Sequence, residues 1–253
     1  MRHSYSSKPI FKRFKLRYSP YSFSKINTYK HCQKKFEWTY VNKKNIDKNY
    51  SDPAYFQRGR FIHQYIAKRL LGQNIEINGY ASIEIDDKLN LINQADEALE
   101  NDYINITFDF DITEVEQPIK LDKSCKISKS KKDSMFTGFI DYYAVHDNLG
   151  VIVDWKSGKF KDRPSFEQLQ LYSIWLIEKY PQIDEIDLLF YYIEHNKFNI
   201  ITIDKQSIIK FRDNLLSDIS TIEKTDTFSI NPSKQCVYCP FFESCLDEFN
   251  ILI

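Results

Sequence analysis

Apolar and aromatic residues recur every three or four positions along the N-terminal part of the chain. This spacing is typical of helices that bury one face. It predicts a helix from Ser22 or Ser24, either of which could cap it, to about Val41, a second from Pro53 to Leu71, and a third from Lys88 to Tyr103. The positions expected to be buried in them are Phe23, Ile26, Tyr29, Phe36, Tyr40, Phe56, Ile62, Tyr65, Ile66, Leu70, Leu91, Ala95, Ala98 and Leu99.

The pattern then changes to one of strands. Alternation at residues 113–119 predicts a strand, and the segment from Phe136 to Val145 predicts a second. A turn at 147–150 leads into Val151–Trp155, an apolar run typical of a strand buried on both faces. Residues 120–134, between the first two strands, are rich in lysine and are expected to form a mobile connection.

The rest of the chain predicts a helix, a hairpin, a last helix and an irregular tail. These elements are expected at Ser165–Tyr180, at Ile186–Ile193 and Phe198–Ile203, at Gln206–Lys224, and at residues 231–246. The order of elements predicts an α/β fold with a central mixed sheet flanked by helices.

We expect these elements to form a single integrated domain, because 253 residues with 42% hydrophobic content are enough for one large core. Within it, residues 1–110 would form a mostly helical N-terminal part, 111–230 the part that holds the sheet, and 231–253 a cysteine-rich tail.

Charge is balanced overall but uneven along the chain. There are 35 basic and 35 acidic residues, yet residues 1–36 contain ten lysines and arginines and no acid. Such a basic terminus can be a solvated arm or can contact phosphate groups.

The sequence also bears on location. It contains no apolar run long enough for a membrane span, and its N-terminus lacks the apolar segment of a secretory signal. Five cysteines is an odd number that fits poorly with a full disulfide framework, so a reducing cytoplasm is expected.

Two acids and a lysine stand out on neighbouring predicted strands. Asp154 and Lys156 lie two residues apart, so they share one face of a strand, and Asp141 lies on the strand before it. Carboxylates at neighbouring strand ends can hold Mg²⁺ or Mn²⁺, and an ammonium can position water or stabilise charge on a phosphate. Each residue could instead form an ordinary salt bridge or hydrogen bond.

Two helical segments supply further candidates. His63 follows Gly59 on the second predicted helix, where it could equally be a packed or surface residue. Gln168 and Tyr172 are one helical turn apart and share a face, as an ordinary polar pair also would. Glu116 could lie next to the metal ligands and support them without binding the metal directly, or it could be a strand residue that faces solvent.

The order of these segments, a histidine, then G-x-x-D, D-x-K and Q-x-x-x-Y, resembles the PD-(D/E)XK nuclease superfamily and its RecB-like exonuclease branch. The resemblance extends from about Ser22 to Cys245 and implies a restriction-endonuclease-like core in residues 111–230.

The resemblance also implies roles for particular residues. His63, Asp141, Asp154 and a backbone carbonyl near Trp155 would bind Mg²⁺ or Mn²⁺, and Lys156 would assist catalysis beside Gln168 and Tyr172. With a nuclease core, contact with DNA phosphates becomes the favoured role of the basic residues, for which the candidates are Lys12, Arg13, Lys15, Arg17 and Arg60.

Four cysteines suggest a second site. Cys32 in the first helix and the C-x2-C-x5-C tail of Cys236, Cys239 and Cys245 are similar to the iron–sulfur members of this branch, such as AddB-type and CRISPR-associated RecB-like nucleases. That similarity implies a structural [4Fe–4S] cluster, and Cys₄ zinc is the alternative. The chain departs from the common form at Gln33, where proline often follows the first cysteine. Cys125 is expected to be a free thiol.

Together these features predict a metal-dependent DNA exonuclease that hydrolyses phosphodiester bonds, by resemblance at single-stranded ends, in DNA recombination, repair or processing. Its partners would be DNA and recombination, helicase or CRISPR proteins. The alternatives are a noncatalytic DNA-binding or assembly subunit with the same fold, and a Cys₄ zinc scaffold in which the D-x-K spacing is coincidental.

Overall fold

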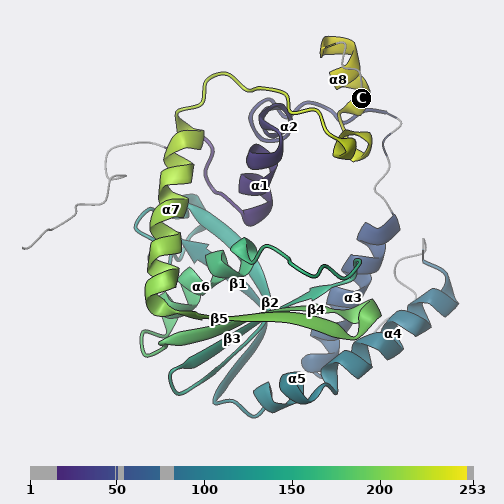
Figure 1. The fold of residues 1–253 in the computed structure, drawn as a ribbon, viewed down its shortest axis with the longest axis vertical. Coiled ribbons are helices and arrows are strands. Elements are labelled where there is room, and N and C mark those ends of the chain that lie inside the picture. Colours follow the sequence, from purple (N-terminus) through teal and green to yellow (C-terminus); the bar gives the residue numbers. More distant parts are fainter. Residues whose placement is uncertain (1–15, 49, 51–53, 75–82, 250–253) are drawn as a thin grey trace, which may run out of the picture.

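A five-stranded mixed sheet forms the centre of the molecule in the computed structural model, which describes residues 16–48, 50, 54–74 and 83–249 (Figure 1). The strands follow chain order, β1-β2-β3-β4-β5, and only β3 and β4 pair in parallel. Their bounds are Ile112–Leu121, Phe136–His146, Leu149–Lys156, Glu185–Tyr192 and Lys197–Asp204. Because β3 and β4 run parallel, the chain must cross back between them, and helix α6 (Glu167–Lys179) forms this crossover connection. The predicted fold class is therefore confirmed.

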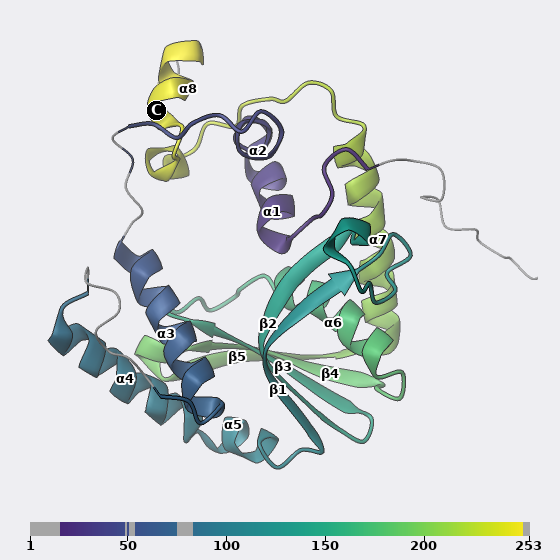
Figure 2. The same ribbon diagram turned by 180° about the vertical axis from the view of Figure 1, so that it is seen from behind.

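Helices cover both faces of this sheet. On one face, α3 (Ala54–Leu70), α4 (Ile85–Leu99) and α5 (Asp102–Thr107) pack against Val151 and Val153 of β3. On the other face lie α6 and α7 (Lys205–Glu223) (Figure 2), which share a hydrophobic core with Ile152 of β3. Because β3 is buried on both faces, its sequence is a continuous apolar run rather than an alternating one.

The first predicted helix is interrupted at Cys32. The chain forms α1 (Phe23–His31), leaves helical geometry at Cys32 with φ −157° and ψ 109°, and continues as α2 (Gln33–Phe36) and a π-helical turn, Glu37–Val41. The C-terminal segment supplies bonds at the break: Lys34 N–H donates to Ser229 O at 2.9 Å. The prediction of one continuous helix was wrong because these tertiary contacts replace helical ones.

Other element ends also differ from the sequence predictions. The third helix begins a turn earlier, at Ile85, and divides where Asn101 caps α5 by accepting from Tyr103 N–H. The tail is partly helical, since it contains a 3₁₀ turn, Lys234–Tyr238, and helix α8, Phe242–Phe249. Pro53 lies outside the described residues.

The Lys-rich connection between β1 and β2 is anchored in the core. Cys125, within it, is buried, and Leu121 and Ile127 form a β-bridge. The expectation of a mobile connection took no account of this buried side chain. Among the described residues, no helix is long and apolar enough to cross a membrane.

Candidate active site

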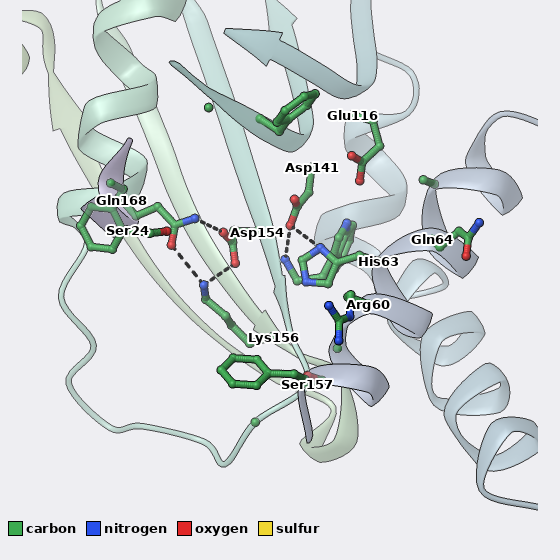
Figure 3. Close-up of a pocket in the computed structure, with 18 of the residues that line it drawn as sticks. Ser24, Arg60, His63, Gln64, Glu116, Asp141, Asp154, Lys156, Ser157 and Gln168 are labelled. Carbon is green, nitrogen blue, oxygen red and sulfur yellow. Dashed lines mark hydrogen bonds and ion pairs between the residues drawn. The ribbon is translucent and has the colours of Figure 1, made fainter. Parts of the chain in front are cut away.

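The site forms where strands β2 and β3 diverge. Their pairing runs from His146↔Leu149 to Tyr142↔Val153 and stops there, although both strands continue. Asp141 and Asp154 are the next residues on the two strands. The Trp155 N–H donates to Asp141 Oδ2 at 3.0 Å, so this carboxylate takes the place of the missing strand acceptor (Figure 3). The fork in the sheet thus brings both acids to one place.

Asp154 is buried and is held by two side chains. Gln168 Nε2, from the crossover helix α6, donates to Oδ1 at 2.8 Å, and Lys156 Nζ lies 2.6 Å from Oδ2 (Figure 3). The buried Oδ2 is thus paired with the Lys156 ammonium. Lys156 Nζ also donates to Gln168 Oε1 at 3.3 Å, and Gln168 Nε2 donates to the Tyr172 hydroxyl at 3.1 Å. The structure therefore brings together four predicted catalytic residues.

His63 comes from α3, on the far side of the cleft from α6. Its Nδ1 lies 3.2 Å from Asp141 Oδ2. Gly59, one turn earlier, lies close to the residue that follows β3, because a Cβ there would be 2.9 Å from Ser157 Oγ. The predicted glycine–histidine segment thus lies where α3 packs against the end of β3.

Glu116 joins this group. Its backbone has φ +52°, within β1, and its neighbours Val115 and Gln117 pair with the residues on either side of Asp141. Ligand atoms of His63, Glu116 and Asp141 all lie within 4.8 Å of one another. Sequence analysis left two roles open for Glu116, and in the structure it lies beside Asp141 and His63.

Crowding of the acids shifts the proton affinities in the site. Burial alone would lower the pKa of His63, but the negative charges of Asp141 and Asp154 outweigh it and raise that pKa to about 9. Burial and the charge of Asp141 raise the pKa of Asp154 to about 6, against the opposing effects of Lys156 and His63. Burial, and then Asp141, also raise the pKa of Glu116.

These residues fit a divalent cation. Carboxylate oxygens and an imidazole nitrogen are ligands that suit Mg²⁺ and Mn²⁺, and imidazole favours manganese. Burial, and then the charge of Asp141, raise the pKa values of Asp154 and Glu116, and a bound cation would oppose both effects. The indole of Trp155 is buried against Tyr191, and a metal contact from its carbonyl stays a prediction.

A cleft of about 1000 Å³ opens over these residues and is lined by parts of α1, α3, β2, β3 and α6. Of the predicted DNA contacts, Arg60 lines the cleft. Arg17 instead pairs with Asp226 at 2.5 Å, and its backbone N–H donates to Glu223. Lys12, Arg13 and Lys15 lie outside the described residues.

The four predicted cluster cysteines line one separate cavity of about 430 Å³. They are Cys32, Cys236, Cys239 and Cys245. Burial, and then the neighbouring thiols, raise the pKa of Cys245 to about 11. Among the described residues, no three of these sulfurs lie within 4.8 Å of one another. Cys125 is in the main core, away from this cavity.

Similar proteins are found by comparison of structures. No curated protein matches the chain. A crystal structure named "Putative exonuclease", from Eubacterium rectale, is similar with a TM-score of 0.53 at 10% identity, covering 92% of this chain and 88% of that one. A second structure, of a protein called SSO0001, has a TM-score of 0.33 at 16% identity and covers 74% of this chain and 95% of that one.

A sequence model of one family matches almost the whole chain. The match covers residues 20–246, which include the fork of the sheet, the crossover helix and all four cysteines of the second cavity. The chain belongs to the PD-(D/E)XK nuclease superfamily.

Proposed function

We propose that this chain is a metal-dependent DNA exonuclease that acts at single-stranded ends. The observation that carries the proposal is the convergence of His63, Asp141, Asp154 and Lys156 on one open cleft.

His63, Asp141 and Asp154 would hold the metal, with Glu116 close enough to join them. A bound Mg²⁺ or Mn²⁺ supplies positive charge that polarises the phosphate and acidifies water. Lys156 remains beside Asp154 and places a second positive charge at the edge of the cleft, where it can orient water or stabilise charge on the phosphate. Gln168 acts as a positioning residue because it contacts both Asp154 and Lys156.

We further propose that the cysteine cavity holds a [4Fe–4S] cluster, as in the RecB-like branch. The four cysteines line one cavity of about 430 Å³, which has room for such a cluster. Lys34, Lys35 and Lys234 line the cavity and would offset the negative charge of the four thiolates.

End-labelled DNA tests the proposed activity. With Mn²⁺ or Mg²⁺, the protein should release labelled nucleotides from a single-stranded 5′- or 3′-end faster than from a blunt duplex, and EDTA should stop the reaction. Circular single-stranded DNA of equal length is the matched control, because an exonuclease needs an end. Cutting of the circle at the linear rate would contradict exonuclease action, and no cutting of either would contradict nuclease action.

Metal binding should release a proton near neutral pH. His63 has a pKa of about 9 in the metal-free site, so below that pH it must lose a proton to bind a cation. We expect one proton per metal at pH 7.5, and an apparent affinity that rises about tenfold per pH unit between pH 7 and 9. Calorimetry of Mn²⁺ binding in two buffers of different ionisation enthalpy measures this release. His63→Asn should remove it, and no release by the wild type would show that His63 is not protonated in the metal-free site at this pH.

The basic N-terminus should contribute salt-dependent affinity. Changing Lys12, Arg13 and Lys15 together to glutamine should flatten the slope of log affinity against log salt for a single strand by about 0.7 per lost phosphate contact. Because Arg17 is already paired with Asp226, it is left unchanged. The matched control changes three exposed lysines outside the cleft, which are Lys129, Lys131 and Lys132. If the slope of log affinity against log salt is the same in the wild type and in the Lys12, Arg13 and Lys15 variant, these residues do not contact DNA and form a solvated arm.

A further inference from the structure

Exposed aromatic side chains gather at the catalytic cleft. Among the described residues, four Phe, Tyr or Trp side chains are more than a third exposed: Tyr55 (53%), Phe56 (46%), Phe139 (59%) and Tyr238 (65%). All except Tyr238 line the cleft. Leaving a large aromatic surface in water gives up the stabilisation that its burial would provide. The arrangement therefore points to a ligand with flat apolar faces.

The aromatic side chains lie on two walls around the acids. Phe56, Arg60 and His63 follow one another at helical spacing on the face of α3 that lines the cleft, and Phe56 precedes His63 by about 10 Å along the helix axis. The rings of Tyr55 and Phe56 are 4.5 Å apart between centroids. On the other wall, Phe139 precedes Asp141 by two residues on β2. A strand threaded through the cleft would thus meet aromatic rings beside the catalytic centre.

The charges of the cleft do not favour a duplex. Four cations and three carboxylates line it, which are Arg60, His63, Lys68, Lys156, Glu116, Asp141 and Asp154. Two of the cations are already paired, Lys156 with Asp154 and His63 with Asp141. Duplex binding draws most of its affinity from phosphate contacts, which need an excess of positive charge. Stacking on aromatic side chains is the other main source of affinity, and it needs bases whose faces are not covered by neighbouring base pairs.

We propose that the cleft binds single-stranded DNA by stacking unpaired bases on Phe139 and on the Tyr55–Phe56 pair, and that these side chains set the preference for single strands. The inference rests on the proposed nuclease function and assigns residues to its substrate specificity. The backbone of Phe139 is held in the sheet, where β2 pairs with β1 at Pro118↔Phe139.

The test compares an oligothymidylate with an abasic strand of equal length and equal phosphate number. For the wild type, KM should be at least about tenfold higher for the abasic strand, which cannot stack. In Phe139→Ala and in Phe56→Ala this KM ratio should fall toward one. Phe139→Trp keeps an aromatic ring at this position, so it should keep the KM ratio of the wild type. Ile106→Ala is the matched control, because Ile106 is 63% exposed on α5 and lies outside the cleft.

The KM ratio separates stacking from misfolding, because a loosened fold would affect both strands alike. Equal KM values for the two strands in the wild type would overturn the stacking proposal and leave the nuclease function standing. A ratio unchanged in Phe139→Ala and in Phe56→Ala, or lowered as much by Ile106→Ala, would also overturn it. Cleavage of neither strand by the wild type would instead overturn the nuclease function.

Discussion

Replacing Lys156 with alanine should lower the rate of DNA cleavage by at least about 10³-fold, because one positioned charge or proton donor typically contributes 10²–10⁴-fold. Its Nζ lies 2.6 Å from Asp154 Oδ2 and 3.3 Å from Gln168 Oε1, so two partners fix the ammonium at the edge of the cleft. Single-strand binding should change by less than about tenfold, since affinity comes from stacking and phosphate contacts elsewhere. Single-turnover cleavage and fluorescence anisotropy measure the two quantities.

Asp154→Asn should have an equally large effect on cleavage for a different reason. The asparagine oxygen can still accept from Gln168 Nε2, but the negative charge that would hold a metal and pair with Lys156 is lost. Lys210→Ala is the control, because Lys210 is exposed on α7 and lies outside the cleft. Wild-type cleavage by the Asp154 or the Lys156 variant would show that the reaction occurs elsewhere.

The sequence predicted the acids and the lysine of the site for a simple geometric reason. Strand periodicity places Asp154 and Lys156 on one face, and a short turn makes the strand that carries Asp141 their neighbour. Gln168 was expected at the site only through the resemblance to the superfamily, and the structure shows that its helix supplies the crossover between the parallel strands β3 and β4.

Glu116 shows where local spacing stops being informative. Glu114 and Glu116 alternate in the same way along β1, and nothing in the sequence separates them. The left-handed backbone at Glu116, with φ +52°, changes the direction of its side chain, and it depends on how β1 passes the fork between β2 and β3. Such a conformation is rare outside glycine and has no reliable sequence signal when a glutamate adopts it.

The break at Cys32 has the same kind of origin. No proline or glycine occurs between Ser22 and Val41, so the helical pattern runs through the break. The interruption depends on the distant segment around Ser229 and Asn231, whose Nδ2 donates to His31 O at 2.8 Å. The break turns Cys32 into the cap of α2, with its Sγ facing the same cavity as the three tail cysteines.

Cys32→Ser should therefore remove the iron–sulfur cluster and destabilise the protein together. The proposed cluster links Cys32 to Cys236, Cys239 and Cys245, so it closes a loop of roughly 200 residues. A single cross-link over such a loop stabilises by about 5 kcal/mol in the chain-entropy model, which corresponds to a Tm lower by about 10 °C or more in the variant. Anaerobically purified wild type should be brown with broad absorbance near ~400 nm, and the variant should be colourless.

Cys125→Ala separates loss of the cluster from loss of a buried thiol. Cys125 is buried in the main core and away from the cysteine cavity, so the variant should keep its colour and lose only about 1 kcal/mol of stability through a small cavity. Residual cleavage by Cys32→Ser should fall with temperature in step with its unfolding, because the catalytic cleft uses other residues. A colourless wild type with one zinc per chain would replace the cluster with a Cys₄ zinc site. Loss of colour in Cys125→Ala would mean that Cys125, not Cys32, is the fourth ligand.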